Sequence, residues 1–265
     1  MAQAILAHHG MICVRQLLKN RFTRVLLSAT TPKSFSARIL GESQFAMTHA
    51  GASPSWERMW KGGLGQGQAF DVGDVSATLS AALARENFAP RPGMTALVPG
   101  CGRAYDALAL AKHGFESVVA VDLAPTACKA AQTWLRETGD PAAAKVSVQC
   151  ADFFSLQGEH DFIWDCTFLC ALDPSVRQSW ARKQSELLSK DGTLLTCVFP
   201  ICEKVGGPPF AMSVPLVREL LEPVGLQAVA VQDPVPEAER HNPGGAPGAL
   251  GTALLAWRKS ENCSL

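Results

Sequence analysis

The sequence lacks several features that would place it in a specialised structural class. No run of about 18 apolar residues occurs in its 265 residues, so a hydrophobic transmembrane helix is not expected. Charged residues make up 18% of the chain and hydrophobic residues 47%, which is typical of a protein with a buried core rather than of a disordered one. We therefore expect a globular protein without membrane insertion.

An excess of charge of either sign is also missing. The chain has 24 basic and 24 acidic residues, and its formal net charge is +0 at pH 7. Proteins that bind the phosphates of nucleic acid usually carry a basic face. We expect no nucleic-acid partner, and a small molecule is the favoured ligand.

Cysteine spacing typical of zinc sites is absent as well. The nine cysteines include no C-x-x-C pair, and no histidine pair has zinc-site spacing. An odd number of cysteines without a secretory leader indicates reduced thiols, which behave as small buried hydrophobic groups. The sequence predicts neither a disulfide framework nor a metal site.

The N-terminal region differs in charge from the rest of the chain. Residues 1–50 contain six basic residues and one acidic residue, and the basic groups are interleaved with leucine, valine and phenylalanine and followed by serine and threonine. An amphipathic, arginine-bearing, acid-poor leader is typical of an organellar transit peptide. We predict that residues 1–48 are such a leader, with the mitochondrion favoured over plastid or cytoplasm; a disordered extension is the alternative.

Strand-like and helix-like segments alternate from about residue 54 onward. Strands are expected at residues 94–99, 118–121, 146–149, 162–164, 193–199, 227–231 and 252–257. Helices are expected at residues 104–113, 125–137, 174–188 and 215–221, with residues 190–192 stopping the third. Such alternation predicts an α/β fold, a mostly parallel seven-stranded sheet with helices on both faces. We expect one domain at residues 49–258, a surface loop at 234–248 and a flexible tail at 259–265, and nothing requires more than a monomer.

The chemistry-bearing residues follow the predicted strands. Gly100 and Gly102 form a glycine-rich turn after the first strand, and Asp122 ends the second strand, where a carboxylate can hold both hydroxyls of a ribose. A dinucleotide site needs a third glycine, but that position is Tyr105. S-Adenosylmethionine has no pyrophosphate and does not need that glycine. A nucleotide-dependent oxidoreductase is kept as the alternative.

Several motifs in order carry a family resemblance. They are WxxxW at 56–60, FDxG at 70–73, LVPGCG at 97–102, and an aspartate at 165 followed by FxCALxP at 168–174. Together they resemble the thiopurine S-methyltransferase superfamily. RxxWA at 177–181, LLxxDG at 187–192 and GGPPF at 206–210 resemble its plant-type thiol, thiocyanate and halide methyltransferase branch. The resemblance runs from about residue 56 to 257.

This resemblance implies a class I, Rossmann-like, S-adenosylmethionine-dependent methyltransferase that acts on a thiol, hydrosulfide, thiocyanate or halide. By position it implies that Trp56, Trp60 and Phe70 form an aromatic lid over the cofactor and that Gly100 contacts the cofactor at the glycine loop. Asp122 would hold the ribose, and Asp152 and Phe153 would flank the adenine. Asp165 and Cys166 would lie beside the methionine portion or the acceptor. Trp56 and Trp60 are also spaced for one helical face, and ordinary packing is their alternative. The position of Phe70 is often tryptophan in the family, so an N–H donor is lost.

On the acceptor side, the sequence departs from the family pattern. Cys166 stands where the plant branch tends to have tyrosine and thiopurine-type members arginine, so neither substrate contact can be transferred. Tyr105 and Phe210 are further acceptor-side candidates. A thiolate or halide already bears the attacking lone pair, so alignment and removal of water suffice and no general base is required. Because a fold does not establish activity, a catalytically inactive cofactor-binding protein is another alternative.

Overall fold

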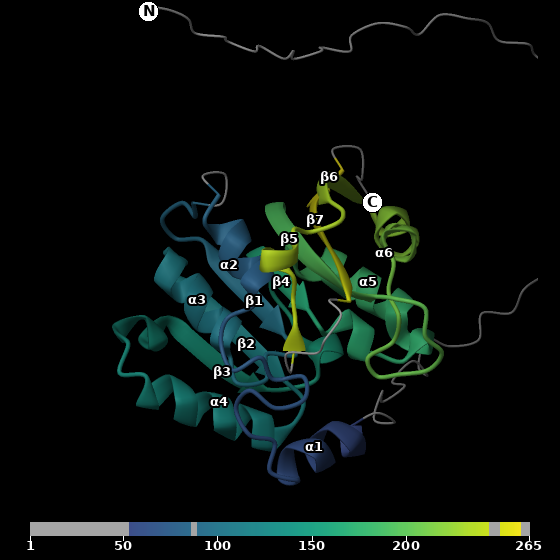
Figure 1. Ribbon diagram of the computed structural model, residues 1–265. Coiled ribbons are helices and arrows are strands. Elements are labelled where there is room, and N and C mark those ends of the chain that lie inside the picture. Colours follow the sequence, from purple (N-terminus) through teal and green to yellow (C-terminus); the bar gives the residue numbers. More distant parts are fainter. Residues whose placement is uncertain (1–52, 86–88, 244–249, 261–265) are drawn as a thin grey trace, which may run out of the picture. The chain divides into compact units, whose positions relative to one another are not determined.

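The computed structural model describes residues 53–85, 89–243 and 250–260 (Figure 1). The predicted leader at 1–48 and most of the predicted tail lie outside these residues. Among the described residues, no helix combines the length and apolar character needed to cross a membrane. The same residues contain no group of three or more His, Cys, Asp or Glu side chains that could hold a metal ion.

A seven-stranded sheet forms the centre of the described domain, with the strand order β3-β2-β1-β4-β5-β7-β6. The strands are β1 (Thr95–Pro99), β2 (Ser117–Asp122), β3 (Val146–Cys150), β4 (His160–Cys166), β5 (Leu188–Ile201), β6 (Leu226–Gln232) and β7 (Gly251–Lys259). The first five strands in this order pair in parallel, whereas β7 runs antiparallel to both β5 and β6. The mostly parallel sheet predicted from the sequence is confirmed.

Helices cover both faces of this sheet, as expected (Figure 1). They are α1 (Ser53–Lys61), α2 (Ala77–Leu83), α3 (Tyr105–His113), α4 (Pro125–Glu137), α5 (Arg177–Leu187) and α6 (Val214–Leu221). Side chains of α2, α3 and α4 share one apolar cluster with Ala96 and Val98, and those of α5 and α6 share the other with Leu97. Successive residues of β1 therefore face opposite layers, as the strand pleat requires.

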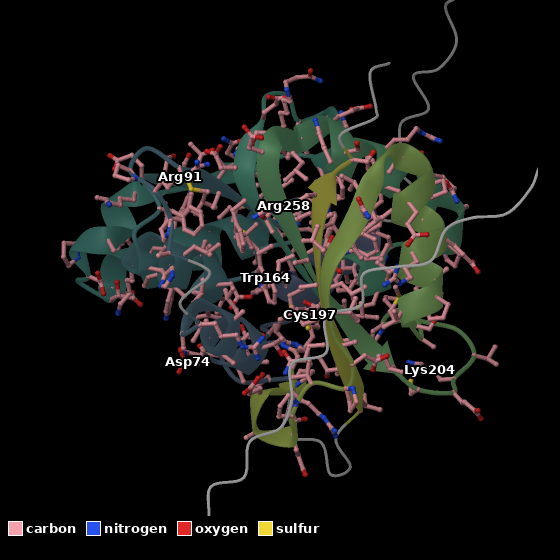
Figure 2. All side chains as sticks on the ribbon, turned by 90° about the horizontal axis from the view of Figure 1, so that it is seen from above. Asp74, Arg91, Trp164, Cys197, Lys204 and Arg258 are labelled. Atoms are coloured by element: carbon pink, nitrogen blue, oxygen red, sulfur yellow. The ribbon has the colours of Figure 1, made fainter. Side chains whose placement is uncertain are left out.

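Burial separates the interior of the sheet from the loops around it. Trp164 on β4 and Cys197 on β5 are buried, whereas Asp74 and Lys204 are exposed on connecting segments (Figure 2). Parallel strands that are covered on both faces bury most of their side chains, so the strands correspond to the near-continuous apolar runs in the sequence.

Several elements differ from the sequence prediction. Residues 190–192 do not form a turn, because β5 begins at Leu188 directly after α5. A Cβ atom on Gly192 would lie 2.8 Å from Leu188 Cδ1, so this glycine permits close packing inside the strand. β7 continues to Lys259 and takes the first residue of the predicted tail, and α2 is a helix that the sequence patterns did not predict.

Candidate active site

A cavity of about 910 Å³ lies at the carboxyl ends of the parallel strands. Nine of the predicted site residues line it: Trp56, Trp60, Phe70, Gly100, Tyr105, Asp122, Asp152, Phe153 and Cys166. Phe199 on β5 also lines the cavity, so residues at or after the ends of five strands meet at one place, as expected for a ligand site in a parallel sheet. Asp165 and Phe210 do not line this cavity.

The glycine loop brings bare backbone to the cavity wall. Gly100 and Gly102 have φ angles of +62° and +51°, in the left-handed region that favours glycine. A Cβ atom on Gly100 would lie 2.6 Å from Phe168 Cδ2, so no side chain fits there. The loop is tied to the next strand because the Cys101 amide donates to the carbonyl of Val121 over 2.9 Å.

Asp122 is held beside this loop in a fixed orientation. Its Oδ2 accepts a hydrogen bond from the Gly102 amide (3.0 Å) and its Oδ1 accepts one from the Ala124 amide (2.9 Å). Burial raises the pKa of this carboxyl, although these backbone donors act against the shift. Each oxygen has a second lone pair, and the side chain remains partly exposed at the cavity. The arrangement fits the two hydroxyls of a ribose.

Asp152 and Phe153 form the neighbouring wall. Asp152 Oδ1 accepts a hydrogen bond from the Phe154 amide over 2.9 Å and caps a short 3₁₀ turn. Phe153 is buried and packs edge-to-face against Phe168, with 5.0 Å between ring centroids. A carboxylate with acceptor capacity next to an apolar ring fits the amino group and the face of an adenine.

Three aromatic side chains cover the cavity from the N-terminal side. Trp56 and Trp60 lie on one face of α1, and both contact Phe70 edge-on, with centroid distances of 5.7 and 6.1 Å. The helix is anchored on α4 because the Glu57 carboxylate accepts hydrogen bonds from the Thr126 amide and hydroxyl. The predicted aromatic cluster is therefore formed.

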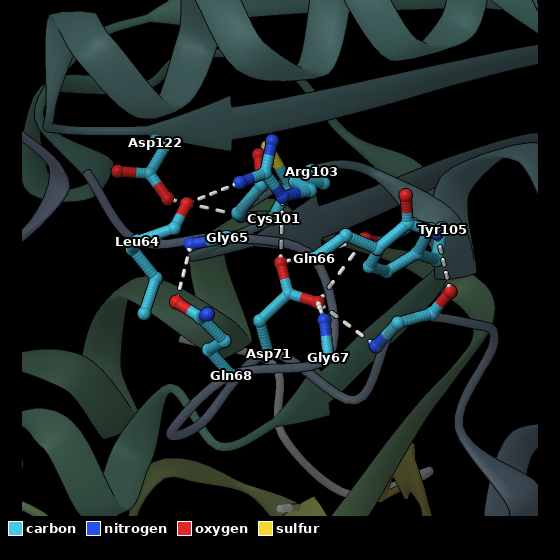
Figure 3. Close-up of polar contacts among 12 residues, drawn as sticks. Leu64, Gly65, Gln66, Gly67, Gln68, Asp71, Cys101, Arg103, Tyr105 and Asp122 are labelled. Carbon is cyan, nitrogen blue, oxygen red and sulfur yellow. Dashed lines mark hydrogen bonds and ion pairs between the residues drawn. The ribbon is translucent and has the colours of Figure 1, made fainter.

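Asp71 is the centre of a polar network that the sequence motif did not explain (Figure 3). Its carboxylate accepts hydrogen bonds from the Gly67 and Gly73 amides over 3.1 and 2.8 Å. It also pairs with Arg103 Nε at 2.8 Å and accepts a bond from the Tyr105 hydroxyl at 3.1 Å. These contacts fold residues 62–76, hereafter the strap, over the glycine loop.

Tyr105 and Arg103 consequently have defined partners. Burial and the charge of Asp71 raise the pKa of Tyr105, so its hydroxyl remains a donor to that carboxylate. The guanidinium of Arg103 also lies 5.3 Å from the ring centroid of Trp60. Both side chains connect the strap to the glycine loop, and Tyr105 lines the cavity with its hydroxyl already engaged.

Asp165 and Phe210 occupy other positions than the resemblance implied. The carboxylate of Asp165 accepts hydrogen bonds from Trp180 Nε1 (2.8 Å) and Gln184 Nε2 (2.9 Å) on α5, and burial raises its pKa to about 6. Phe210 lies against the guanidinium of Arg177, and the neighbouring Pro208 and Pro209 line the cavity instead. Asp165 thus braces the core beneath the site.

His241 is a cavity residue that sequence reasoning missed. It belongs to the stretch predicted as a surface loop at 234–248, yet its side chain is buried and lines the cavity. Its Nδ1 lies 3.3 Å from Ser76 Oγ and 3.6 Å from Cys166 Sγ. No local pattern indicates this contact, because Ser76 and His241 are 165 residues apart in the chain.

Comparison with known proteins gives the family. The model of the family described as thiopurine S-methyltransferase matches residues 52–254. The chain belongs to this family. It is a methyltransferase that depends on S-adenosylmethionine, and the oxidoreductase alternative is set aside.

Plant enzymes are among the similar relatives of this methyltransferase. It is 34% identical over 184 residues to the probable thiol methyltransferase 2 of Arabidopsis thaliana, covering 69% of this chain and 77% of that protein. It is 36% identical over 168 residues to the thiocyanate methyltransferase 1 of the same plant, covering 62% and 69%.

The fold of this methyltransferase also has solved counterparts. The magnesium protoporphyrin IX methyltransferase of Synechocystis PCC 6803, solved with bound S-adenosylmethionine, superposes with a TM-score of 0.56 at 15% identity. The match covers 80% of this chain and 92% of that structure. At this identity the likeness concerns the fold alone.

Proposed function

We propose that this methyltransferase transfers a methyl group to a small soft nucleophile: a thiol, hydrosulfide, thiocyanate or halide. The observation that carries the proposal is the chemical nature of the cavity wall beyond the strand ends. This part of the wall consists of a thiol and apolar side chains, from buried Cys166 and Phe199 together with Pro208 and Pro209. The names of the two plant relatives, thiol and thiocyanate methyltransferase, support the same acceptor class.

Asp106, a cavity carboxylate whose charge acts on Cys166, is not free to act as a base. Asp106 accepts hydrogen bonds from the Ser76 amide (2.8 Å) and from Trp164 Nε1 (2.7 Å). Burial raises the pKa of Asp106, and these two donors act against the shift. An acceptor that already bears a lone pair on a soft anion needs no base, so the engaged carboxylate is compatible with the proposed chemistry.

Bound S-adenosylmethionine supplies a methyl group whose bond to sulfur breaks as the acceptor's lone pair forms the new bond, and with an anionic acceptor no proton moves. The chain contributes orientation and removal of water. Asp122 and the glycine loop would hold the ribose, Asp152 and Phe153 the adenine, and the aromatic cluster would exclude solvent. Correct alignment can lower a barrier by several kcal/mol, about 7–11 in the best intramolecular cases.

The test is a methyl-transfer assay of the full chain with iodide, thiocyanate, hydrosulfide and a small thiol. We expect the methylated acceptor together with demethylated cofactor for at least one of them. The Asp122→Ala variant should lose cofactor binding in calorimetry, whereas Asp191→Ala, an exposed residue outside the cavity, should bind normally. A folded protein that binds the cofactor but methylates no acceptor would instead favour the inactive cofactor-binding alternative.

We further propose that residues 1–48 direct the chain to the mitochondrion, on the basis of their basic, acid-poor composition. A fluorescent protein fused behind residues 1–48 should enter mitochondria in cells, and the fusion without them should not. Plastid import or cytoplasmic fluorescence of the first fusion would contradict this.

A further inference from the structure

His241 lines the cavity, and one buried polar atom of its ring has no protein partner among the described residues. The side chain is only 6% exposed, and the cavity lining includes it. Its Nε2 has no hydrogen-bond partner among the described residues. A buried polar nitrogen in a native protein normally has a hydrogen-bond partner, so we expect a bound ligand to supply the partner of this atom.

The other side of the ring is held in place by two protein groups. Nδ1 faces the Ser76 hydroxyl at 3.3 Å and the Cys166 thiol at 3.6 Å. The ring also packs edge-on against Phe199, with 5.0 Å between centroids. Ser76 is itself fixed, because its amide donates to Asp106 Oδ1 over 2.8 Å. The imidazole therefore has a defined orientation before any ligand binds.

The groups that face Nδ1 favour the tautomer of the neutral ring with its proton on Nε2. The groups facing Nδ1 are a hydroxyl and a thiol, and each has a proton to donate. An imidazole nitrogen is a stronger acceptor than a thiol sulfur, so the Ser76 hydroxyl donates to Nδ1 and the thiol of Cys166 faces the Ser76 oxygen at 4.0 Å. The proton of the neutral ring then resides on Nε2.

The charge around the ring is consistent with a neutral imidazole. Burial lowers the pKa of His241 to about 4. The carboxylate closest in this network, Asp106, is engaged by the Ser76 amide and by Trp164. Burial and the hydrogen bond to Cys197 raise the pKa of Cys166, so the adjacent thiol is also uncharged.

We propose that Nε2–H of His241 donates a hydrogen bond to the methyl acceptor and thereby binds and orients an anionic acceptor such as hydrosulfide, a thiolate or iodide. This inference rests on the proposed function. A neutral donor can orient an anion without burying a second ionised group, and it leaves the anion's remaining lone pairs free for attack. No proton is transferred, because the negative charge of the acceptor and the positive charge of the sulfonium cancel when the new bond forms.

The first test compares steady-state kinetics of three variants with the wild-type chain. His241→Phe keeps the ring shape but has no donor, and we expect the KM for the anionic acceptor to rise about tenfold or more. His241→Gln places an amide N–H near the position of Nε2 and should recover most of this loss. Ser76→Ala should raise the acceptor KM less than His241→Phe does, because it removes only the group that fixes the tautomer. The affinity for S-adenosylmethionine should stay unchanged in all three.

His113→Gln is the matched control, since this residue lies at the end of α3 and outside the cavity lining. It should leave the acceptor KM unchanged. Circular dichroism and cofactor binding show whether each variant folds. An unchanged acceptor KM in folded His241→Phe, when the wild type turns over, would overturn the inference and leave the proposed function standing.

The second test does not depend on turnover or on a variant that folds. Wild-type chain saturated with the demethylated cofactor is titrated with iodide, and ring nitrogens of ¹⁵N-labelled histidine are followed by NMR. We expect Nε2 of His241 to be the protonated nitrogen and to shift saturably with iodide. A proton on Nδ1, or no shift at saturating iodide, would contradict the proposal, whereas a wild type that binds iodide but methylates nothing would contradict only the proposed function.

Discussion

Gly100 shows at the scale of one residue how backbone geometry shapes the cavity wall. Its φ angle is +62°, and an added Cβ would meet Phe168 at 2.6 Å. Gly139 has nearly the same φ, +63°, but an added Cβ there meets nothing within 4 Å. The two glycines therefore separate backbone strain from steric conflict.

We predict that Gly100→Ala weakens cofactor binding and lowers the free energy of unfolding by about 1–3 kcal/mol more than Gly139→Ala does, because only the first change adds a clash. Calorimetry and urea denaturation measure the two effects. Equal losses in both variants would mean that φ strain alone is responsible.

As pH falls, the protonation of Asp165 and that of His241 should change the free energy of unfolding in opposite directions. Burial raises the pKa of Asp165 to about 6 in the folded protein, so the native state holds this proton more tightly and loses stability as pH rises from about 4 to 6. Burial lowers the pKa of His241 from 6.5 to about 4, so the native state loses stability as pH falls across that window. The two contributions oppose each other.

Removing the acid should expose the histidine effect. We predict that in Asp165→Asn the free energy of unfolding falls more steeply between pH 6.5 and pH 4 than in the wild type. Urea denaturation at pH values across this range measures the slope. The Asp191→Asn control, at an exposed position, should keep the wild-type slope. Parallel slopes for Asp165→Asn and wild type would contradict the assignment.

At the scale of an element, the strap contains no helix or strand, and one carboxylate makes the central contacts that hold it. Asp71 is 6% exposed and joins two strap amides to Arg103 and Tyr105. Truncating one partner of such a buried network leaves the other groups unpaired, which costs more than the hydrogen bond itself contributes.

We predict that Asp71→Asn weakens cofactor affinity by about 1–3 kcal/mol, because Arg103 loses its partner and the strap loosens over the glycine loop. Hydrogen exchange at the Gly67 and Gly73 amides should become faster, whereas exchange in β4 should not change. Protection of both glycine amides at the wild-type level would show that the strap does not depend on this carboxylate.

At the scale of the whole molecule, β7 connects the parallel strands to the far edge of the sheet. It lies between β5 and β6, and no residue of β7 lines the cavity. Trp257 on this strand is fully buried, and its Nε1 donates to Thr196 Oγ1 on β5 over 3.0 Å. Stability and ligand binding are therefore separable at this position.

We predict that Trp257→Ala lowers the free energy of unfolding by about 3–5 kcal/mol through the cavity it leaves. Thr196→Val, which removes only the hydrogen-bond acceptor, should cost less, about 1–3 kcal/mol. Urea denaturation gives both values, and calorimetry on the folded fraction should show unchanged cofactor affinity. A loss of affinity equal to the loss of stability would contradict the separation.

The sequence by itself determined the part of the cavity that we propose holds the cofactor. The glycine turn follows β1, Asp122 is the last residue of β2 and Asp152 lies two residues after β3, and parallel strands carry such residues to one edge of the sheet. The paired tryptophans of α1 were similarly local, because four-residue spacing fixes one helical face. These features depend on neighbours in the chain.

Only the tertiary structure decided the part of the cavity that we propose binds the acceptor. Asp165 and Cys166 are adjacent on β4 and point to opposite faces, and no local pattern states which face borders the cavity. His241 contacts Ser76, which is 165 residues away in the chain. The antiparallel position of β7 between β5 and β6 likewise depends on pairing between strands that are distant in the sequence. Such contacts form because distant segments pack together, and sequence periodicity describes only what each segment does on its own.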